Sequence, residues 1–217
     1  GNLLDHVEIR YAGYYGYQTS FRNFDQAASL YTATSDLTLS NSTIRNGDGT
    51  GVYIAGASPL VTGNLITTHS FGLLVTGSSA VITGNTIQDN GSYGVSVTTS
   101  PGVTITGNTI TGSGQFALWF DAVSAAAAVS GNVITGNPGN NGIYVNGGTI
   151  DQPATWTVDA PYVLGGTLTI AAGVTLTLEP GVVVKAWGIN HKFVVNGTLL
   201  ADGTSSLPIV FTSLRDD

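Results

Sequence analysis

Three side chains that could form a small polar site recur at nearly one-repeat spacing. Asp48, His69 and Asp89 lie four, three and two residues after isoleucines that occupy the same place in three consecutive repeats. Carboxylates and an imidazole are suitable ligands for a metal ion and partners for a sugar hydroxyl. Because the offsets differ, and because Asp in a turn commonly bonds its own backbone, ordinary turns are the competing interpretation.

A second group of candidate binding residues is aromatic. Ile9 and Ile44 occupy equivalent places in neighbouring repeats but are 35 residues apart, so we expect an inserted loop around residues 12–25. That loop carries Tyr14, Tyr15, Tyr17, Phe21 and Arg22. Exposed rings beside polar groups stack on sugar rings or on a protein partner. The alternative is that the loop folds over the flank of the protein and buries its own rings.

An internal repeat defines the elements that must position these groups. The segment Val-Ile-Thr-Gly-Asn-Thr-Ile at 81–87 has close copies at 60–66, 103–110 and 128–134, with 21, 23 and 24 residues between successive asparagines. A period of this length is typical of solenoids. Each repeat holds short β-branched runs bounded by Gly and Asn, which predict strands. The sequence therefore predicts an all-β parallel β-helix with 21–25 residues per coil.

Stacked coils bring equivalent residues into columns. Two buried apolar columns are expected, one of Val61, Ile82, Ile105 and Val129 and one of Ile66, Ile87, Ile110 and Ile134. An internal polar ladder is expected from Asn64, Asn85, Asn108 and Asn132, with Ser42 in the same position of the preceding repeat. Buried amides must have paired donors and acceptors, and identical amides on neighbouring coils supply those partners.

The sequence changes style near Ile150 while the period persists. Residues 1–150 carry the asparagine-ladder coils, and residues 151–217 alternate strictly, as in Val-Thr-Leu-Thr-Leu at 174–178. No Gly/Ser or Pro run separates the two parts. We therefore expect residues 151–217 to continue the same solenoid.

Composition restricts the function. Only 9% of the 217 residues are charged, the formal net charge is −7, and six Lys and Arg cannot neutralise a run of phosphates, so no nucleic-acid partner is expected. No stretch is apolar enough to span a membrane. Without cysteine there is no thiol chemistry, and we expect neither a cofactor nor a dedicated metal centre. Low charge with abundant Thr, Asn and Gly favours an extracellular or cell-surface location.

The repeat units resemble a known family. Thr-Gly-Asn-Thr-Ile type units at Thr62, Thr83 and Thr106 resemble the right-handed parallel β-helix repeats of the pectate-lyase-like superfamily. Residues 162–217 are similar to a recurring module of large bacterial and archaeal surface-exposed β-helix proteins. In that family this module usually precedes a segment similar to residues 4–13, and here the order is reversed. Together with the lack of methionine, even at position 1, this suggests a processed or excised piece of a tandem array.

Three functions are compatible with such a scaffold. The first is a non-catalytic structural or interaction module of an exported bacterial or archaeal protein, serving as a spacer, fibre or adhesin segment. Its open ends would pair with other copies or adjacent modules, and carbohydrate is a further candidate partner. The alternative is a uronan lyase, hydrolase or epimerase, or a carbohydrate-binding module; the enzymes need charged residues stacked on adjacent coils, and here the Asp residues are scattered. Ice binding would need two threonine columns, and the sequence provides one, which Ser130 interrupts.

Overall fold

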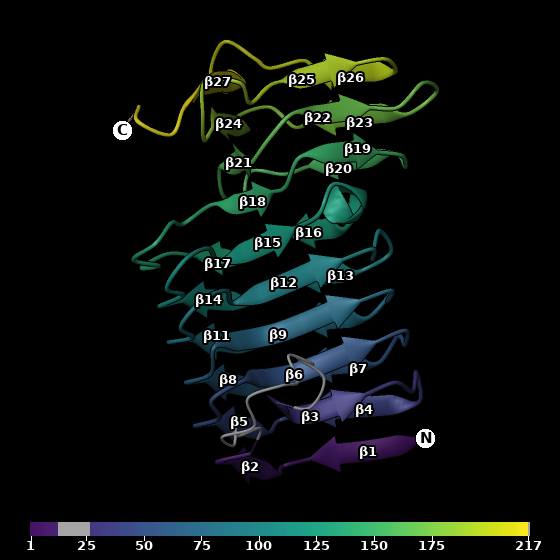
Figure 1. The fold of residues 1–217 in the computed structure, drawn as a ribbon, viewed down its shortest axis with the longest axis vertical. Coiled ribbons are helices and arrows are strands. Elements are labelled where there is room, and N and C mark those ends of the chain that lie inside the picture. Colours follow the sequence, from purple (N-terminus) through teal and green to yellow (C-terminus); the bar gives the residue numbers. More distant parts are fainter. Residues whose placement is uncertain (13–26, 217) are drawn as a thin grey trace, which may run out of the picture.

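The chain folds as a right-handed parallel β-solenoid with about 22 residues per coil, as the repeat predicts. The computed structural model describes residues 1–12 and 27–216. The coils stack along the long axis, with the N-terminus at one end and the C-terminus near the other (Figure 1).

Two sheets run through the N-terminal coils only. Sheet A pairs, in order, β1 (Asn2–Asp5), β4 (Leu37–Ser40), β7 (Leu60–Thr62), β10 (Val81–Thr83), β13 (Thr104–Thr106) and β16 (Ala128–Ser130). Sheet B pairs β2 (Glu8–Arg10), β5 (Thr43–Arg45), β8 (Leu65–Thr67), β11 (Thr86–Gln88), β14 (Thr109–Thr111) and β17 (Val133–Ile134). Every pairing is parallel, so each strand repeats the residue positions of the strand one coil earlier.

A third sheet continues along the whole solenoid. Sheet C pairs β3 (Ala28–Thr32), β6 (Thr50–Ala55), β9 (Phe71–Thr76), β12 (Val95–Thr98), β15 (Leu118–Phe120), β18 (Ile143–Val145), β21 (Tyr162–Leu164), β24 (Val183–Ala186) and β27 (Val210–Ser213). Beyond β18, sheets A and B are replaced by sheet D, of β19 (Gly148–Ile150), β22 (Leu168–Ile170) and β25 (Phe193–Val195), and sheet E, of β20 (Ala154–Trp156), β23 (Thr175–Leu178) and β26 (Thr198–Ala201). Sheet C therefore joins the two sequence styles in one solenoid.

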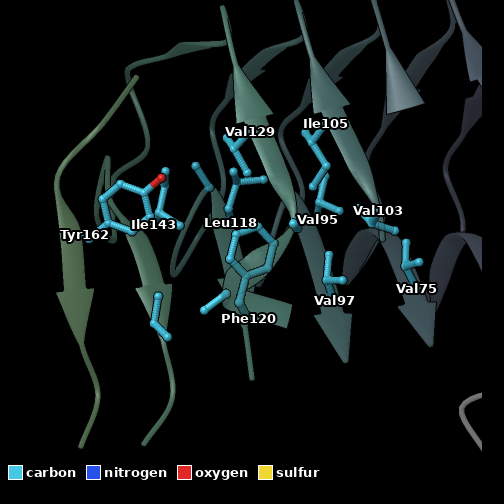
Figure 2. Packing of buried hydrophobic residues seen from close by; sticks show 14 of the residues in the cluster. Val75, Val95, Val97, Val103, Ile105, Leu118, Phe120, Val129, Ile143 and Tyr162 are labelled. Atoms are coloured by element: carbon cyan, nitrogen blue, oxygen red, sulfur yellow. The ribbon is translucent and has the colours of Figure 1, made fainter. Parts of the chain in front are cut away.

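The expected apolar columns form the core. Ile82 lies opposite Val61 and Ile105, and Ile87 opposite Ile66 and Ile110. These six side chains are fully buried. Figure 2 shows side chains of neighbouring coils pointing into the same interior, with Phe120 among them. Burial of this branched apolar surface, at about 25 cal/mol per Å², is the main stabilising term.

A stacked aromatic pair fills the core where the style changes. The rings of Trp156 and Tyr162 are 4.0 Å apart and nearly parallel, at 2°. The indole Nε1 of Trp156 donates to the Ala125 carbonyl at 3.1 Å, and the Thr157 N–H donates to the Tyr162 hydroxyl at 3.2 Å. Burial raises the pKa of Tyr162 well above its ordinary value. Ala125 belongs to η2 (Val123–Ala126), a 3-10 turn.

The turn between sheets A and B requires one residue with left-handed backbone geometry. Gly84 has φ 64°, and the equivalent glycines in the adjacent coils are similar. No atom lies within 4 Å of a Cβ built on Gly84, so the backbone conformation, and not space, selects glycine here. His6 and Asn41 take this conformation, at φ 55° and 46°, in the first two coils.

No helix in the described ranges, 1–12 and 27–216, is both long and apolar enough to cross a membrane.

Candidate functional site

The amide ladder runs through the turn between sheets A and B. The Asn64 backbone N–H and Nδ2 both donate to Oδ1 of Asn85, at 2.9 and 3.0 Å, and Asn85 donates in the same way to Asn108. Nδ2 of Asn85 also donates to the Val61 and Thr83 carbonyls. Each amide is thus satisfied on both sides although it is buried, which is the condition a buried polar group must meet.

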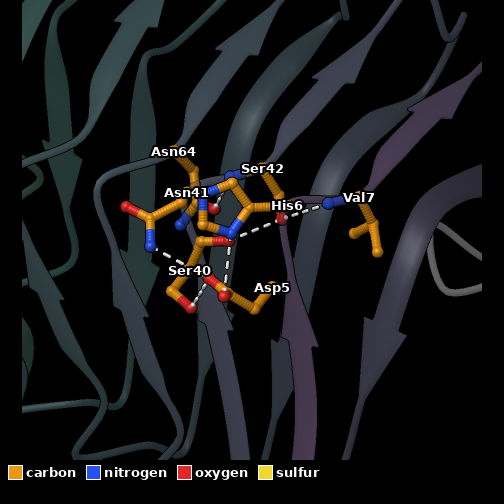
Figure 3. Close-up of polar contacts among 7 residues, drawn as sticks. All are labelled: Asp5, His6, Val7, Ser40, Asn41, Ser42 and Asn64. Carbon is orange, nitrogen blue, oxygen red and sulfur yellow. Dashed lines mark hydrogen bonds and ion pairs between the residues drawn. The ribbon is translucent and has the colours of Figure 1, made fainter.

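The ladder has different residues at its two ends. At the N-terminal end Ser42 replaces asparagine: its N–H donates to Oδ1 of Asn64, and its hydroxyl oxygen accepts the Val7 N–H, each at 3.0 Å (Figure 3). At the other end the Asp159 carboxylate accepts three N–H groups, from the Gly131 backbone at 2.9 Å and from the Asn132 backbone and Nδ2 at 2.8 Å. A carboxylate only accepts, so it ends the ladder. Asp159 also lies where sheets A and B stop.

A second polar column lies in the turn between sheets B and C, and His69 is part of it. Asn90 accepts the His69 backbone N–H at 3.1 Å, and Asn137 accepts the Ser113 N–H at 2.8 Å. A serine ladder supports the turn after sheet C, where the Ser78 N–H donates to Ser100, whose own N–H donates to Ser124. His69 therefore occupies a position that its neighbours fill with asparagine or serine.

The His69 ring is buried, with 4% of the residue exposed. Its Nε2 lies 3.1 Å from the hydroxyl of Ser29, and that hydroxyl donates to the Ala12 carbonyl, so Nε2 carries the proton that completes the contact. Nδ1 is buried and has no hydrogen-bond partner among the described residues. Burial lowers the pKa of His69 to about 4, against a smaller opposing effect of the Thr67 backbone. The ring is therefore neutral at pH 7, and within residues 1–12 and 27–216 no carboxylate is bonded to it to orient it for acid-base work.

The structure places Asp48, His69 and Asp89 in three different columns. Asp48 and Asp89 are exposed at the surface, whereas His69 points inward. Asp89 is a turn residue with φ 54°, and His69 follows the turn residue of its own coil. Among the described residues no three His, Cys, Asp or Glu side chains gather closely enough to hold a metal ion. Their unequal offsets put each of the three at a different point of the turn, so coil stacking does not align them in one column, and a polar site formed by them stays a prediction.

The structure does not describe the candidate residues of the aromatic loop. Tyr14, Tyr15, Tyr17, Phe21 and Arg22 all lie outside the described residues.

A shallow polar surface lies beside the first ladder turn. The Arg45 guanidinium contacts the Glu8 carboxylate at 2.6 Å, and Asp5 contacts the His6 ring at 2.8 Å. The pKa of Asp5 is lowered to about 2, first by the Ser40 hydroxyl and then by hydrogen bonds from Asn41 and His6 (Figure 3). All four groups are exposed or half exposed, and each contacts another of the four.

An aromatic row along sheet C was not predicted as a site; Trp119 and Tyr144 lie on its strands, while Tyr93 and Trp187 lie just before β12 and just after β24. The row consists of Phe71, Tyr93, Trp119, Tyr144 and Trp187, with Phe116 packed against it. Tyr93 and Trp119 are 6.1 Å apart at 25°, and Trp119 and Tyr144 are 6.2 Å apart at 15°. Trp119 and Tyr144 lie opposite each other in register on β15 and β18. The sequence did contain a signal for this row, because Trp119 and Tyr144 are the middle, outward residues of short apolar runs and lie 25 positions apart.

Comparison with known families places the fold. The profile of the family described as right handed beta helix region matches residues 19–160, and that of the family described as pectate-lyase like beta helix domain matches residues 148–217. The chain belongs to the right-handed β-helix family. Comparisons with curated proteins and with solved structures find no significant match.

Proposed function

We propose that this chain is a non-catalytic structural and interaction module of an exported bacterial or archaeal protein, a stiff segment of the cell surface or extracellular space. Low charge and a surface dominated by Thr, Ser, Asn and Gly support that location. The polar ladders support a rigid rod, since the coils that carry Asn64, Asn85, Asn108 and Asn132 are hydrogen-bonded to one another through side chains as well as strands.

One observation carries the proposal: the last coil exposes apolar columns that the coils before it bury. Leu176 is fully buried, and Leu199 directly above it is half-buried. Val184 is 2% exposed, and Phe211 above it is 52% exposed. The strands β25, β26 and β27 are also edge strands of their sheets. Apolar surface next to free strand edges fits a further β-helical coil, from a second copy or an adjoining module.

The distribution of charged groups supports a role without catalysis. Glu8 is paired with Arg45 at the surface, Asp5 contacts the His6 ring, and no carboxylate of the described residues is bonded to His69. Uronan lyases and related enzymes remain the alternative on this scaffold. They require several carboxylates and a tuned base in one place, and Asp48 and Asp89 do not meet His69.

Association at the end of the rod provides the test. We expect the purified chain to form elongated particles that grow with concentration in light scattering, and to be inert on polygalacturonate and alginate with and without calcium. Val210→Lys on the edge strand β27 should reduce association, because an edge lysine opposes strand pairing. Val81→Lys is the matched control, since both valines are 39% exposed and Val81 lies on an inner strand of sheet A. A strictly monomeric wild type, or turnover of either uronan, contradicts the proposal.

A further inference from the structure

We propose that the aromatic row on sheet C is a binding platform for a neutral, extended polysaccharide, which lies along the solenoid axis with sugar rings stacked on successive side chains. This site is separate from the rod ends, so it does not depend on end-to-end association.

The arrangement of the rings is the first argument. The centroids of Tyr93, Trp119 and Tyr144 are separated by 6.1 and 6.2 Å, more than the roughly 4.8 Å between coils, so the rings do not close into a face-to-face stack. They are nearly parallel, and none is fully buried. Trp187 stands at the end of the row, 6.1 Å from Tyr144 with its ring nearly perpendicular at 84°, and 52% of the residue is exposed.

Gly165 leaves room for the Tyr144 ring to lie close to the sheet. A Cβ on Gly165 would lie 2.0 Å from the hydroxyl oxygen and 2.1 Å from Cζ of Tyr144, so the Tyr144 ring occupies the space above the next coil. The ring thus extends along the rod and does not project from it. Phe116, which is 6% exposed, supports the row from beneath at 4.8 Å from Tyr144 and 5.5 Å from Trp187. Supported rings lose little conformational freedom when a ligand binds.

The chemistry of the row selects a neutral ligand. Its members are uncharged, and burial raises the pKa of both Tyr93 and Tyr144, so these phenols stay protonated and donate hydrogen bonds. The formal net charge of −7 opposes polyanions, including uronans and nucleic acids.

The repeat of the row favours a polymer. A pyranose ring presents an apolar C–H face to an aromatic ring and hydroxyls at its edge, which suits a phenol beside a π surface. Aromatic side chains on successive coils offer such contacts repeatedly along one line. An extended glycan can use several of them, whereas a single sugar can use only one.

The test uses the whole chain and soluble hexasaccharides. Glucose, xylose and mannose β-1,4 hexamers are titrated by calorimetry and by tryptophan fluorescence, with hexagalacturonate as the acidic comparison. We expect at least one neutral hexamer to bind and change the emission of Trp119 and Trp187, while Trp156, 1% exposed in the core, does not respond. No binding by any neutral hexamer at millimolar concentration, or tighter binding of hexagalacturonate, overturns the proposal.

Variants then locate the site. Trp119→Ala should weaken binding about tenfold or more, as expected for an aromatic anchor. Gly165→Ala should also weaken it, because the new methyl displaces Tyr144 while every ring of the row remains. Tyr31→Ala is the matched control: Tyr31 is 50% exposed in the same outward column of sheet C, near Tyr53 and apart from the row, and its loss should leave affinity unchanged. Equal affinity in Trp119→Ala and wild type overturns the assignment.

Discussion

The coils before and after Asp159 satisfy their turns in different ways. Before it, buried side-chain amides carry the hydrogen bonds from coil to coil, as Asn85 does between Asn64 and Asn108. After it, backbone groups join the coils at the corresponding corner, with the Ala171 N–H bonded to the Ile150 carbonyl and the Thr198 N–H bonded to the Val174 carbonyl. Both styles keep sheet C continuous.

The difference teaches how polar groups enter a solenoid core. A ladder of identical amides is satisfied only while its neighbours are present, so the N-terminal coils depend on one another through buried polar contacts. The C-terminal coils bury only apolar columns at the corresponding corner. A substitution of one outward residue there should therefore not disturb the hydrogen bonds of the neighbouring coils. Four measurements, ordered by expected effect, test this contrast.

The largest effect is expected from Asn85→Ala. The substitution removes the acceptor of both the Asn64 backbone N–H and its Nδ2, and it leaves the Val61 and Thr83 carbonyls without their amide donor. Unsatisfied buried donors should lower the free energy of unfolding by about 3 kcal/mol. Urea unfolding measures this. A loss below about 1 kcal/mol would mean that the ladder is not a stabilising network.

Acid should weaken the ladder coils through His69. Its folded-state pKa of about 4 lies below the unfolded value of 6.5, so the unfolded chain takes up the proton first. Stability is therefore full above pH 6.5 and falls as the pH drops towards 4, by about 2.5 kcal/mol between pH 7.5 and 4.5. The pKa of Asp5, about 2, lies below this window, so its carboxylate stays ionised there.

The matched variant for this pH dependence is His69→Asn. Asn90 fills the equivalent position one coil later, so the substitution keeps a residue suited to the column and removes the titrating group. Urea midpoints measured across the same pH range should vary less than in the wild type. An unchanged pH profile in His69→Asn would assign the acid sensitivity to other residues.

The boundary itself is tested by Asp159→Ala. Three N–H groups of Gly131 and Asn132 lose a charged acceptor, which should cost about 2 kcal/mol. Hydrogen exchange should accelerate at these two backbone amides more than within sheets D and E. Asp151→Ala is the control, since Asp151 is exposed and no stability change is expected. Uniform acceleration along the whole rod would show that the two styles are not separable.

The smallest effect is expected in the C-terminal coils. Thr177 lies on β23 between Thr155 and Leu200 in an outward column of sheet E. Thr177→Val should change the free energy of unfolding by less than about 0.5 kcal/mol, because no ladder passes through this position and valine favours strands. Thermal unfolding of the variant and wild type checks this, and a large loss would mean that outward threonines of this region also form a network.

Much of the fold followed from spacing alone. The intervals between Asn64, Asn85 and Asn108 gave the period, and the period gave the stacking of Ile66, Ile87 and Ile110. The site was less predictable. Asp48, His69 and Asp89 were grouped by approximate spacing, and a shift of one or two residues within a turn was enough to expose the carboxylates and bury the imidazole.

Sequence by itself determined which residues stack, because a parallel solenoid translates each position by one coil and therefore converts a periodic sequence into columns. Only the tertiary structure decided which residues outside the repeat contact those columns. It paired Asn132 with Asp159 across the change of style, and it laid Tyr144 over Gly165 in a row with Trp119 and Trp187. These contacts join residues of unlike type at irregular separations, so no repeat records them; they arise from the volume and hydrogen-bonding capacity of side chains that folding brings together.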